Sequence, residues 1–223
     1  MADFVLIHGT TQGPNGWNRL IRELAKNGHR STAVDLAAAP AKTSGELVRV
    51  VKSQVPDDFH APVVVAHSGT GPLIPSICRE LRASHAVWLA ALVPGSDATL
   101  QQEIESAPTS IFSHEWIGEN PTTDVPAAIY FLFHDCDLET LRWALSTVRL
   151  FAPAFLYASN PPALAELPST YIAGIHDRVI QPSWSRRAAH SRLGANYITL
   201  DSGHCPHVSR PVEVAMILNK LPA

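Results

Sequence analysis

Residues 63–71 read Val63-Val64-Val65-Ala66-His67-Ser68-Gly69-Thr70-Gly71, an apolar run that stops at a serine among small residues. The apolar half is typical of a strand buried on both faces of a sheet, and the small residues after it indicate a sharp turn into a helix. Such a turn lifts the Ser68 hydroxyl to the end of the strand and points the first helical N–H groups at whatever that hydroxyl attacks. We therefore predict that Ser68 is a nucleophile.

The turn has the pattern small-x-Ser-x-small, which matches Gly-x-Ser-x-Gly only loosely. Ala66 and Thr70 stand where glycines are usual. Both are bulkier than glycine, so we expect the turn to be tighter or slightly displaced. Taken alone, the stretch fits a Gly/Ser loop that caps an ordinary helix as well as it fits a catalytic serine. The choice between these two interpretations depends on whether the chain supplies a base and a carboxylate for the Ser68 hydroxyl.

Apolar runs and helical periods alternate on both sides of this stretch. Strands are predicted at Phe4–Ile7, Ser31–Leu36, Val63–Ala66, Ala86–Val93, Ser169–Gly174 and Asn196–Leu200. Helices are predicted from Gly16 to a stop at Asn27-Gly28, from a Ser44 cap to Val55, from Ser68 to about Ala83 with a bend at Pro75, from Trp184 to Leu193, and from Pro211 to Leu221. This alternation predicts an α/β fold in which helices flank a mainly parallel sheet of about six strands.

Residues 96–168 break the alternation with helical periods and many prolines. Helices are expected at Leu100–Ile104, Ala127–Phe133 and Leu138–Val148. A strand-poor insertion after the fourth strand is most simply a helical cap over the carboxyl edge of the sheet. We therefore divide the chain into a core of residues 1–95 and 169–223 and a cap of residues 96–168, which is an insertion and not an independent domain.

Aromatic side chains of the cap could line a substrate pocket or form the cap's own core. They are Phe112, Trp116, Tyr130, Phe131, Phe133, Trp143, Phe151, Phe155 and Tyr157. Trp116 and Phe133 are the candidates for substrate contact, together with His67 beside the predicted nucleophile. For His67, core packing and a hydrogen bond behind the site are the alternatives.

Two later strand ends carry the partners that a serine nucleophile needs. Asp177 follows the fifth predicted strand and His204 follows the sixth. Ligands bind beyond the carboxyl ends of parallel strands, so these two residues and Ser68 are expected to meet there. His204 would act as the base for Ser68, and Asp177 would orient the imidazole. Asp135 in the cap and Asp201 are the alternative carboxylates.

Backbone N–H groups for a developing oxyanion are predicted at two strand ends. Gly69 directly follows the nucleophile, and Thr10 follows the first strand and its His8-Gly9 pair. Gly9 lets the backbone approach a substrate closely because it has no side chain. Together with the order Ser, Asp, His along the chain, these groups predict acyl chemistry on Ser68.

Composition narrows the classes of partner. The 223 residues carry a formal net charge of -3, and the scattered lysines and arginines do not form the basic field that a nucleic acid requires. No apolar run approaches a membrane span in length, and the first residues lack the features of a signal peptide. Three widely spaced cysteines indicate reduced thiols. We expect one cytoplasmic domain that acts on a small molecule, with no nucleic acid or membrane partner.

A metal site is the alternative interpretation of the stretch His204-Cys205-Pro206-His207. No second cluster in the sequence supplies the remaining ligand positions, and the catalytic role already accounts for His204. We therefore expect neither a metal ion nor a cofactor.

Nearly the whole chain resembles the α/β-hydrolases, in the branch of plant methylesterases, hydroxynitrile lyases and bacterial esterase-like relatives. The resemblance is carried by Phe4–Gly9 with the loop to Trp17, Gly28-His29, Val34–Leu36, Phe133–Cys136, Asp201–His204 and Ser209–Pro211. It implies an α/β-hydrolase fold with six core parallel strands.

Two departures separate the chain from the lyases of that branch. The lyases carry a lysine directly after the triad histidine, where this chain has Cys205, and they lack the glycine that stands here as Gly9. Both differences favour hydrolysis of a small carboxylic ester. Thioester release or cyclisation, a lyase reaction or cofactor-free oxygen chemistry on the same residues remain alternatives, as does a non-catalytic receptor that keeps the pocket.

Overall fold

A computed structural model describes residues 1–161 and 167–221. Within these residues, six strands form one sheet in the order β2-β1-β3-β4-β5-β6, and every neighbouring pair is parallel. The strands are β1 (Asp3–Ile7), β2 (Arg30–Val34), β3 (Val63–His67), β4 (His85–Leu89), β5 (Ser169–Gly174) and β6 (Asn196–Leu200). The predicted α/β fold class is confirmed.

Alternate residues of the central strands pack against opposite layers of helices. Phe4 and Leu6 of β1 belong to the core on one face of the sheet, whereas Val5 and Ile7 belong to the core on the other. All four side chains are fully buried. A strand that is covered on both faces needs an uninterrupted apolar run, which is why the sequence identifies this strand so clearly.

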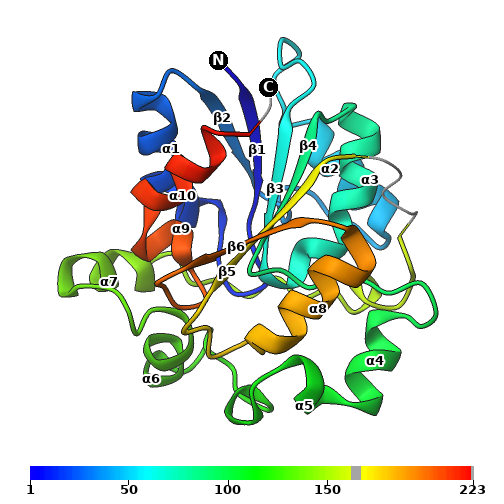
Figure 1. Cartoon of the computed structure of the whole chain (residues 1–223), viewed down its shortest axis with the longest axis vertical. Coiled ribbons are helices and arrows are strands. Elements are labelled where there is room, and N and C mark those ends of the chain that lie inside the picture. Colours follow the sequence, from blue (N-terminus) through cyan, green and yellow to red (C-terminus); the bar gives the residue numbers. More distant parts are fainter. Residues whose placement is uncertain (162–166, 222–223) are drawn as a thin grey trace.

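Helices cover both faces of the sheet (Figure 1). The layer that packs against Phe4 and Leu6 contains α1 (Asn18–Lys26), preceded by the 3₁₀-helix η1 (Pro14–Trp17), and α10 (Pro211–Leu218). The opposite layer contains α2 (Ser44–Lys52), α3 (Ile74–Leu81) and α8 (Pro182–Leu193). The short helix α9 (Pro206–Ser209) connects the end of β6 to α10 and contacts α1.

The connection from β4 to β5 is helical in its described part. It contains α4 (Leu100–Ser106), α5 (Pro108–Ile111), η3 (His114–Trp116), α6 (Val125–Ala127), η4 (Ala128–Leu132), α7 (Leu138–Leu145) and η5 (Ala154–Leu156). Figure 1 shows α4 to α7 along the edge at which the parallel strands end. Residues 162–166 of the predicted cap and 222–223 of the predicted core lie outside the described residues.

The segment after Ser68 differs from the single bent helix that the sequence predicts. A 3₁₀-helix, η2 (Ser68–Leu73), comes first, and α3 begins only at Ile74. Pro75 therefore lies in the first turn of α3, where a missing N–H costs nothing, and it does not bend a longer helix.

Two further boundaries also differ from the sequence prediction. The cap residue of α2 is Thr43, whose side chain accepts a hydrogen bond from the Glu46 N–H, and not Ser44. The fourth strand ends at Leu89 and does not extend to Val93, because Ala90 has a positive φ of 44° that is incompatible with extended backbone.

Candidate active site

The structure brings Ser68, His204 and Asp177 together in one hydrogen-bonded chain. His204 Nε2 lies 2.8 Å from Ser68 Oγ, and His204 Nδ1 lies 2.9 Å from Asp177 Oδ2. A carboxylate can only accept, so Nδ1 carries the ring proton and Nε2 is the acceptor for the serine hydroxyl. Ser68 keeps 7% of its surface exposed and His204 keeps none. This is the arrangement that a base-activated serine requires.

Ser68 stands in a strained turn between β3 and η2. Its φ of 56° lies in the left-handed region, which is unfavourable for a residue with a side chain. The Leu92 N–H donates to the Ser68 carbonyl at 3.0 Å and helps to hold the turn. Position 71 requires a glycine because a Cβ there would overlap the Leu92 carbonyl oxygen. The turn is therefore packed most tightly at Gly71.

Thr70 occupies a position where a glycine is usual, and its hydroxyl explains why it fits. Thr70 Oγ1 lies 2.9 Å from both the His8 and the His67 carbonyl oxygens. The side chain is fully buried and joins the end of β1 to the end of β3. A hydrogen-bonded threonine thus ties the two loops of the site together.

Asp177 is bonded through both of its carboxylate oxygens. Oδ1 accepts the N–H groups of Val179 at 2.7 Å and Ile180 at 3.0 Å, which leaves Oδ2 to His204. The side chain is only 5% exposed. Two backbone donors fix the carboxylate in place, so Asp177 is suited to orient an imidazole.

The two alternative carboxylates bond elsewhere. Asp135 accepts the Gly203 N–H at 2.8 Å and so supports the loop before His204, not its ring. Asp201 bonds His176 at 2.9 Å on the surface, and its side chain is 83% exposed.

His67 lies behind the site and not in an open pocket. It is fully buried, its Nε2 donates to the His204 carbonyl oxygen at 3.0 Å, and its ring packs against the rings of Trp17, His204 and His207. Burial, then the neighbouring His207 and His204, hold the pKa of His67 well below its ordinary value. His67 is therefore a neutral support for His204, as in the alternative of core packing and a hydrogen bond behind the site, and its contact with substrate stays a prediction.

The loop after β1 presents the Thr10 N–H through a hydrogen bond made by His8. The Leu36 N–H donates to His8 Nε2 at 3.1 Å, so the proton is on Nδ1, which donates to the Gly9 carbonyl at 2.8 Å. Because the peptide bond is trans, the Thr10 N–H points away from that carbonyl. Within the described residues no hydrogen bond occupies the N–H of Thr10 or of Gly69. Both predicted oxyanion donors are therefore available.

Trp116 and Phe133 belong to the packing of the cap. Trp116 is half-buried and packs edge-on against Phe131, with ring centroids 5.2 Å apart. Phe133 is 1% exposed and lies in the same core cluster as α3 and α8. These contacts do not place either side chain against Ser68, so their assignment to the pocket stays a prediction.

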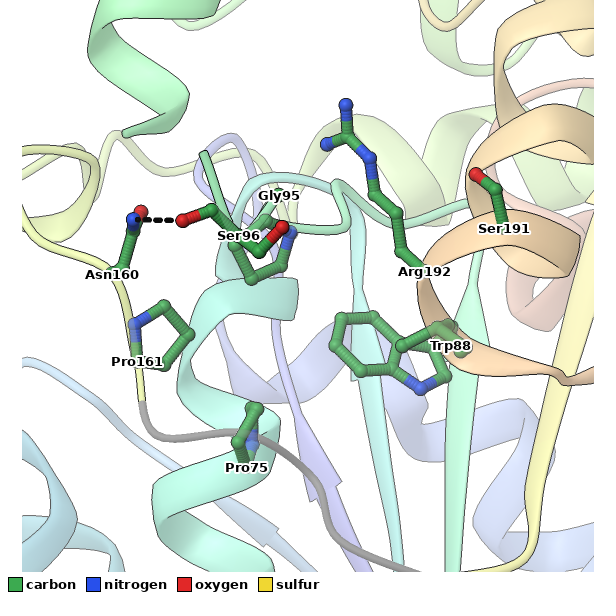
Figure 2. A pocket seen from close by; sticks show the side chains of 10 residues that line it. Pro75, Trp88, Gly95, Ser96, Asn160, Pro161, Ser191 and Arg192 are labelled. Carbon is green, nitrogen blue, oxygen red and sulfur yellow. Dashed lines mark hydrogen bonds between the residues drawn. The ribbon is translucent and has the colours of Figure 1, made fainter. Parts of the chain in front are cut away.

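A cavity of about 470 Å³ lies apart from the predicted site residues (Figure 2). Trp88 of β4, Pro75 of α3 and Arg192 of α8 contribute to its walls, and none of the predicted site residues does. The Arg192 guanidinium is paired with Glu103 at 2.7 Å and bonded to the Val93 carbonyl. The cavity therefore has no free charge from Arg192 with which to hold an anion.

The described residues contain no group of three or more His, Cys, Asp or Glu side chains placed to hold a metal ion. His207, the alternative ligand, bonds Gln12 Oε1 at 3.2 Å. Cys78, Cys136 and Cys205 are all free thiols.

Among the residues that the structure describes, no helix is both long enough and apolar enough to cross a membrane.

Sequence reasoning missed the contributions of two residues. The first is His8, whose ring holds the Gly9 carbonyl. Its position directly before Gly9 at a strand end is the sequence signal that could have identified this role. Tyr157 is only one of nine cap aromatics that could line a pocket by sequence, yet its hydroxyl lies against Gly69, next to the predicted nucleophile. Tyr157 and Gly69 come together only through the folding of the cap connection.

The comparisons with known proteins agree with this architecture. A model of the alpha/beta hydrolase family matches residues 4–217. Methyl jasmonate esterase 1 from Vitis vinifera is 24% identical over 254 residues, covering 98% of this chain and 95% of that protein. The structure of polyneuridine aldehyde esterase has a TM-score of 0.81 at 22% identity and covers 98% of both chains. That of MES16, a methylesterase from Arabidopsis, has a TM-score of 0.74 at 21% identity and covers 98% of this chain and 97% of the other. The predicted fold and family are thus confirmed, and the chain belongs to the alpha/beta hydrolase family.

Proposed function

We propose that this chain is a serine hydrolase that cleaves a small carboxylic ester through an acyl-enzyme on Ser68. The observation that carries the proposal is the hydrogen-bonded chain from Ser68 through His204 to Asp177. Methyl jasmonate esterase 1 and MES16 are named as ester hydrolases, so methyl esters of small acids are the first substrates to test. None of the proposed steps involves a cofactor.

Acylation begins when His204 Nε2 takes the proton of Ser68 Oγ and the oxygen attacks the ester carbonyl. The carbonyl oxygen becomes an oxyanion, which the N–H groups of Gly69 and Thr10 stabilise. The imidazolium of His204 then gives its proton to the leaving alcohol, and the acyl group stays on Ser68. Asp177 stabilises the imidazolium and keeps the ring in place.

Deacylation repeats these steps with water in place of Ser68. His204 takes a proton from a water molecule, the hydroxide attacks the acyl carbonyl, and the same N–H groups hold the second oxyanion. Its collapse releases the carboxylic acid and returns the proton to Ser68 Oγ. The sum is one ester and one water converted into one acid and one alcohol.

We further propose that residues 96–168 act as a cap over this site and that residues 1–95 and 169–223 form the hydrolase core. The support comes from two cap contacts with the loop after β1. The Phe151 N–H donates to the Thr10 carbonyl at 2.7 Å, and the Arg149 N–H donates to the Thr11 carbonyl at 3.1 Å. The cap connection therefore reaches the segment that carries the Thr10 donor.

The test is a panel of short-chain aryl and methyl esters, assayed with the wild-type chain, Ser68→Ala and Ser53→Ala. Ser53 directly follows α2, its hydroxyl donates to the Val50 carbonyl, and it is the matched control. We expect wild-type activity from Ser53→Ala and a loss of about 10⁴- to 10⁶-fold in kcat from Ser68→Ala. Full ester hydrolysis by Ser68→Ala would overturn the proposal.

A fluorophosphonate probe tests the covalent step separately. We expect mass spectrometry to find the probe on the peptide that contains Ser68 in the wild-type chain and not in Ser68→Ala. Labelling without turnover of any ester in the panel would favour a different reaction on the same nucleophile.

A further inference from the structure

The space above Gly69 is filled by a hydroxyl group from the cap connection. A Cβ built on Gly69 would lie closer than 3.0 Å to the Tyr157 hydroxyl oxygen and 2.7 Å from Thr10 Cγ2. Since a Cα–Cβ bond is about 1.5 Å long, the phenolic oxygen lies within about 4.5 Å of Gly69 Cα. The Tyr157 hydroxyl and the Thr10 side chain therefore converge on the residue that follows the nucleophile.

The backbone holds Tyr157 in this position. Tyr157 directly follows η5, which packs against η2, the helix that begins at Ser68. The Gln101 N–H donates to the Tyr157 carbonyl at 3.0 Å, and the preceding Leu156 is 1% exposed. The ring is thus anchored from behind while its hydroxyl faces Gly69. Such a group needs little reorganisation when a substrate binds.

The hydroxyl is free to serve a ligand. Within residues 1–161 and 167–221, no hydrogen bond is recorded for the Tyr157 hydroxyl. Burial raises the pKa of Tyr157 above its ordinary value, so the phenol keeps its proton at neutral pH and is a donor. A half-buried donor beside two unoccupied N–H groups is suited to an oxygen that gains negative charge.

We propose that the Tyr157 hydroxyl donates a third hydrogen bond to the carbonyl oxygen of the substrate as it becomes an oxyanion, beside the N–H groups of Gly69 and Thr10. An oxygen that accepts the Gly69 N–H lies about 2.9 Å from that nitrogen, and the phenol oxygen stands beside the Cα of the same residue. Tyr157 is then a catalytic residue that the cap connection supplies to a site built on the sheet. This inference rests on the ester hydrolysis proposed above.

The test is Tyr157→Phe, which removes only the hydroxyl. We expect kcat and kcat/KM to fall together by about 10²-fold, because a bond made only in the transition state is lost. The fluorophosphonate should also label this variant more slowly, since negative charge develops on the phosphoryl oxygen in the same place. The melting temperature should stay unchanged because the ring still fills its space.

Tyr130→Phe is the matched control. Tyr130 is also a tyrosine of the cap connection, but its hydroxyl bonds Glu115 at 2.6 Å on the surface, and we expect wild-type kcat. Complete labelling by the phosphonate counts the competent sites, so kcat per labelled site is comparable between variants even if some Tyr157→Phe protein is unfolded.

Two outcomes overturn this inference. The first is wild-type kcat per site in Tyr157→Phe, and the second is a raised KM with unchanged kcat, which would make the hydroxyl a ground-state contact only. In either case an inactive Ser68→Ala variant would leave the proposed hydrolysis standing. Full activity of Ser68→Ala would remove both.

Discussion

Gly9 packs directly against His67: a Cβ on Gly9 would lie 2.7 Å from His67 Nδ1 and 3.1 Å from Ser68 Cβ. The loop that presents the Thr10 N–H therefore touches the turn that presents the nucleophile, with no side chain between them. Both neighbours are buried and fixed by hydrogen bonds. Any side chain at position 9 must separate the two halves of the proposed oxyanion site.

Gly9→Ala should therefore lower kcat by about 10²- to 10³-fold, the cost of losing one oxyanion donor. The measurement is steady-state hydrolysis of the best ester of the panel, with the melting temperature recorded in parallel. Gly45→Ala is the control, since its nearest neighbour lies 4.0 Å from the added Cβ and α2 gains a better helix former. Unchanged kcat in a folded Gly9→Ala variant would contradict the assignment of Thr10 as a donor.

Asp177→Asn should fold normally and lose about 10⁴-fold in kcat. The asparagine side-chain oxygen can still accept the Val179 and Ile180 N–H groups, but its NH₂ group then faces His204 Nδ1 and favours the wrong tautomer. Asp201→Asn, on the exposed partner of His176, should keep wild-type activity. The reverse result would mean that Asp201 is the carboxylate that serves His204.

Acid should destabilise the fold through the buried histidines behind the site. Burial, then the nearby His204, lowers the pKa of His207 to about 3, and burial also lowers the pKa of His67. In the unfolded chain a histidine has a pKa of about 6.5, so below that pH the unfolded state binds protons that the folded state does not. The stabilising effect is thus complete above about pH 6.5 and is lost progressively as the pH falls toward 3.

Urea unfolding between pH 7.5 and 5 measures this loss, which should reach about 1.4 kcal/mol per pH unit for each such histidine. His207→Gln removes one of these groups, so the difference between its pH profile and that of the wild type isolates His207 from the carboxylates. Parallel profiles for the two proteins would count against a neutral, buried His207.

Sequence alone predicts those parts of the fold and the site that depend on local pattern. Phe4–Ile7 of β1 and Val63–Ala66 of β3 are apolar because both faces of these strands are covered, and a polar residue that supports the site, His8 or His67, follows each run. The positions of Ser68, Asp177 and His204 after strands follow from the same pattern, because parallel strands bring their carboxyl ends to one edge. Their hydrogen bonds are consistent with that expectation, and their catalytic roles stay a proposal.

What the sequence does not predict depends on contacts between distant segments. The helix after Ser68 begins late because the left-handed backbone at Ser68 leads into a 3₁₀ turn, and no propensity scale signals this. The position of His67 behind His204 depends on how β6 docks. Tyr157 reaches Gly69 only through the path of the cap connection, which residue patterns do not encode.

The strand order has a consequence for when the nucleophile can become reactive. β6 lies at the edge of the sheet and pairs only with β5, from Thr170 opposite Asn196 to Gly174 opposite Leu200. His204 follows this outermost strand and lies 136 residues after Ser68. During synthesis, the turn at Ser68 can form long before its base exists. In the proposed mechanism the serine thus stays inert until the last strand has docked, and the rate of phosphonate labelling during refolding would report the completion of the sheet.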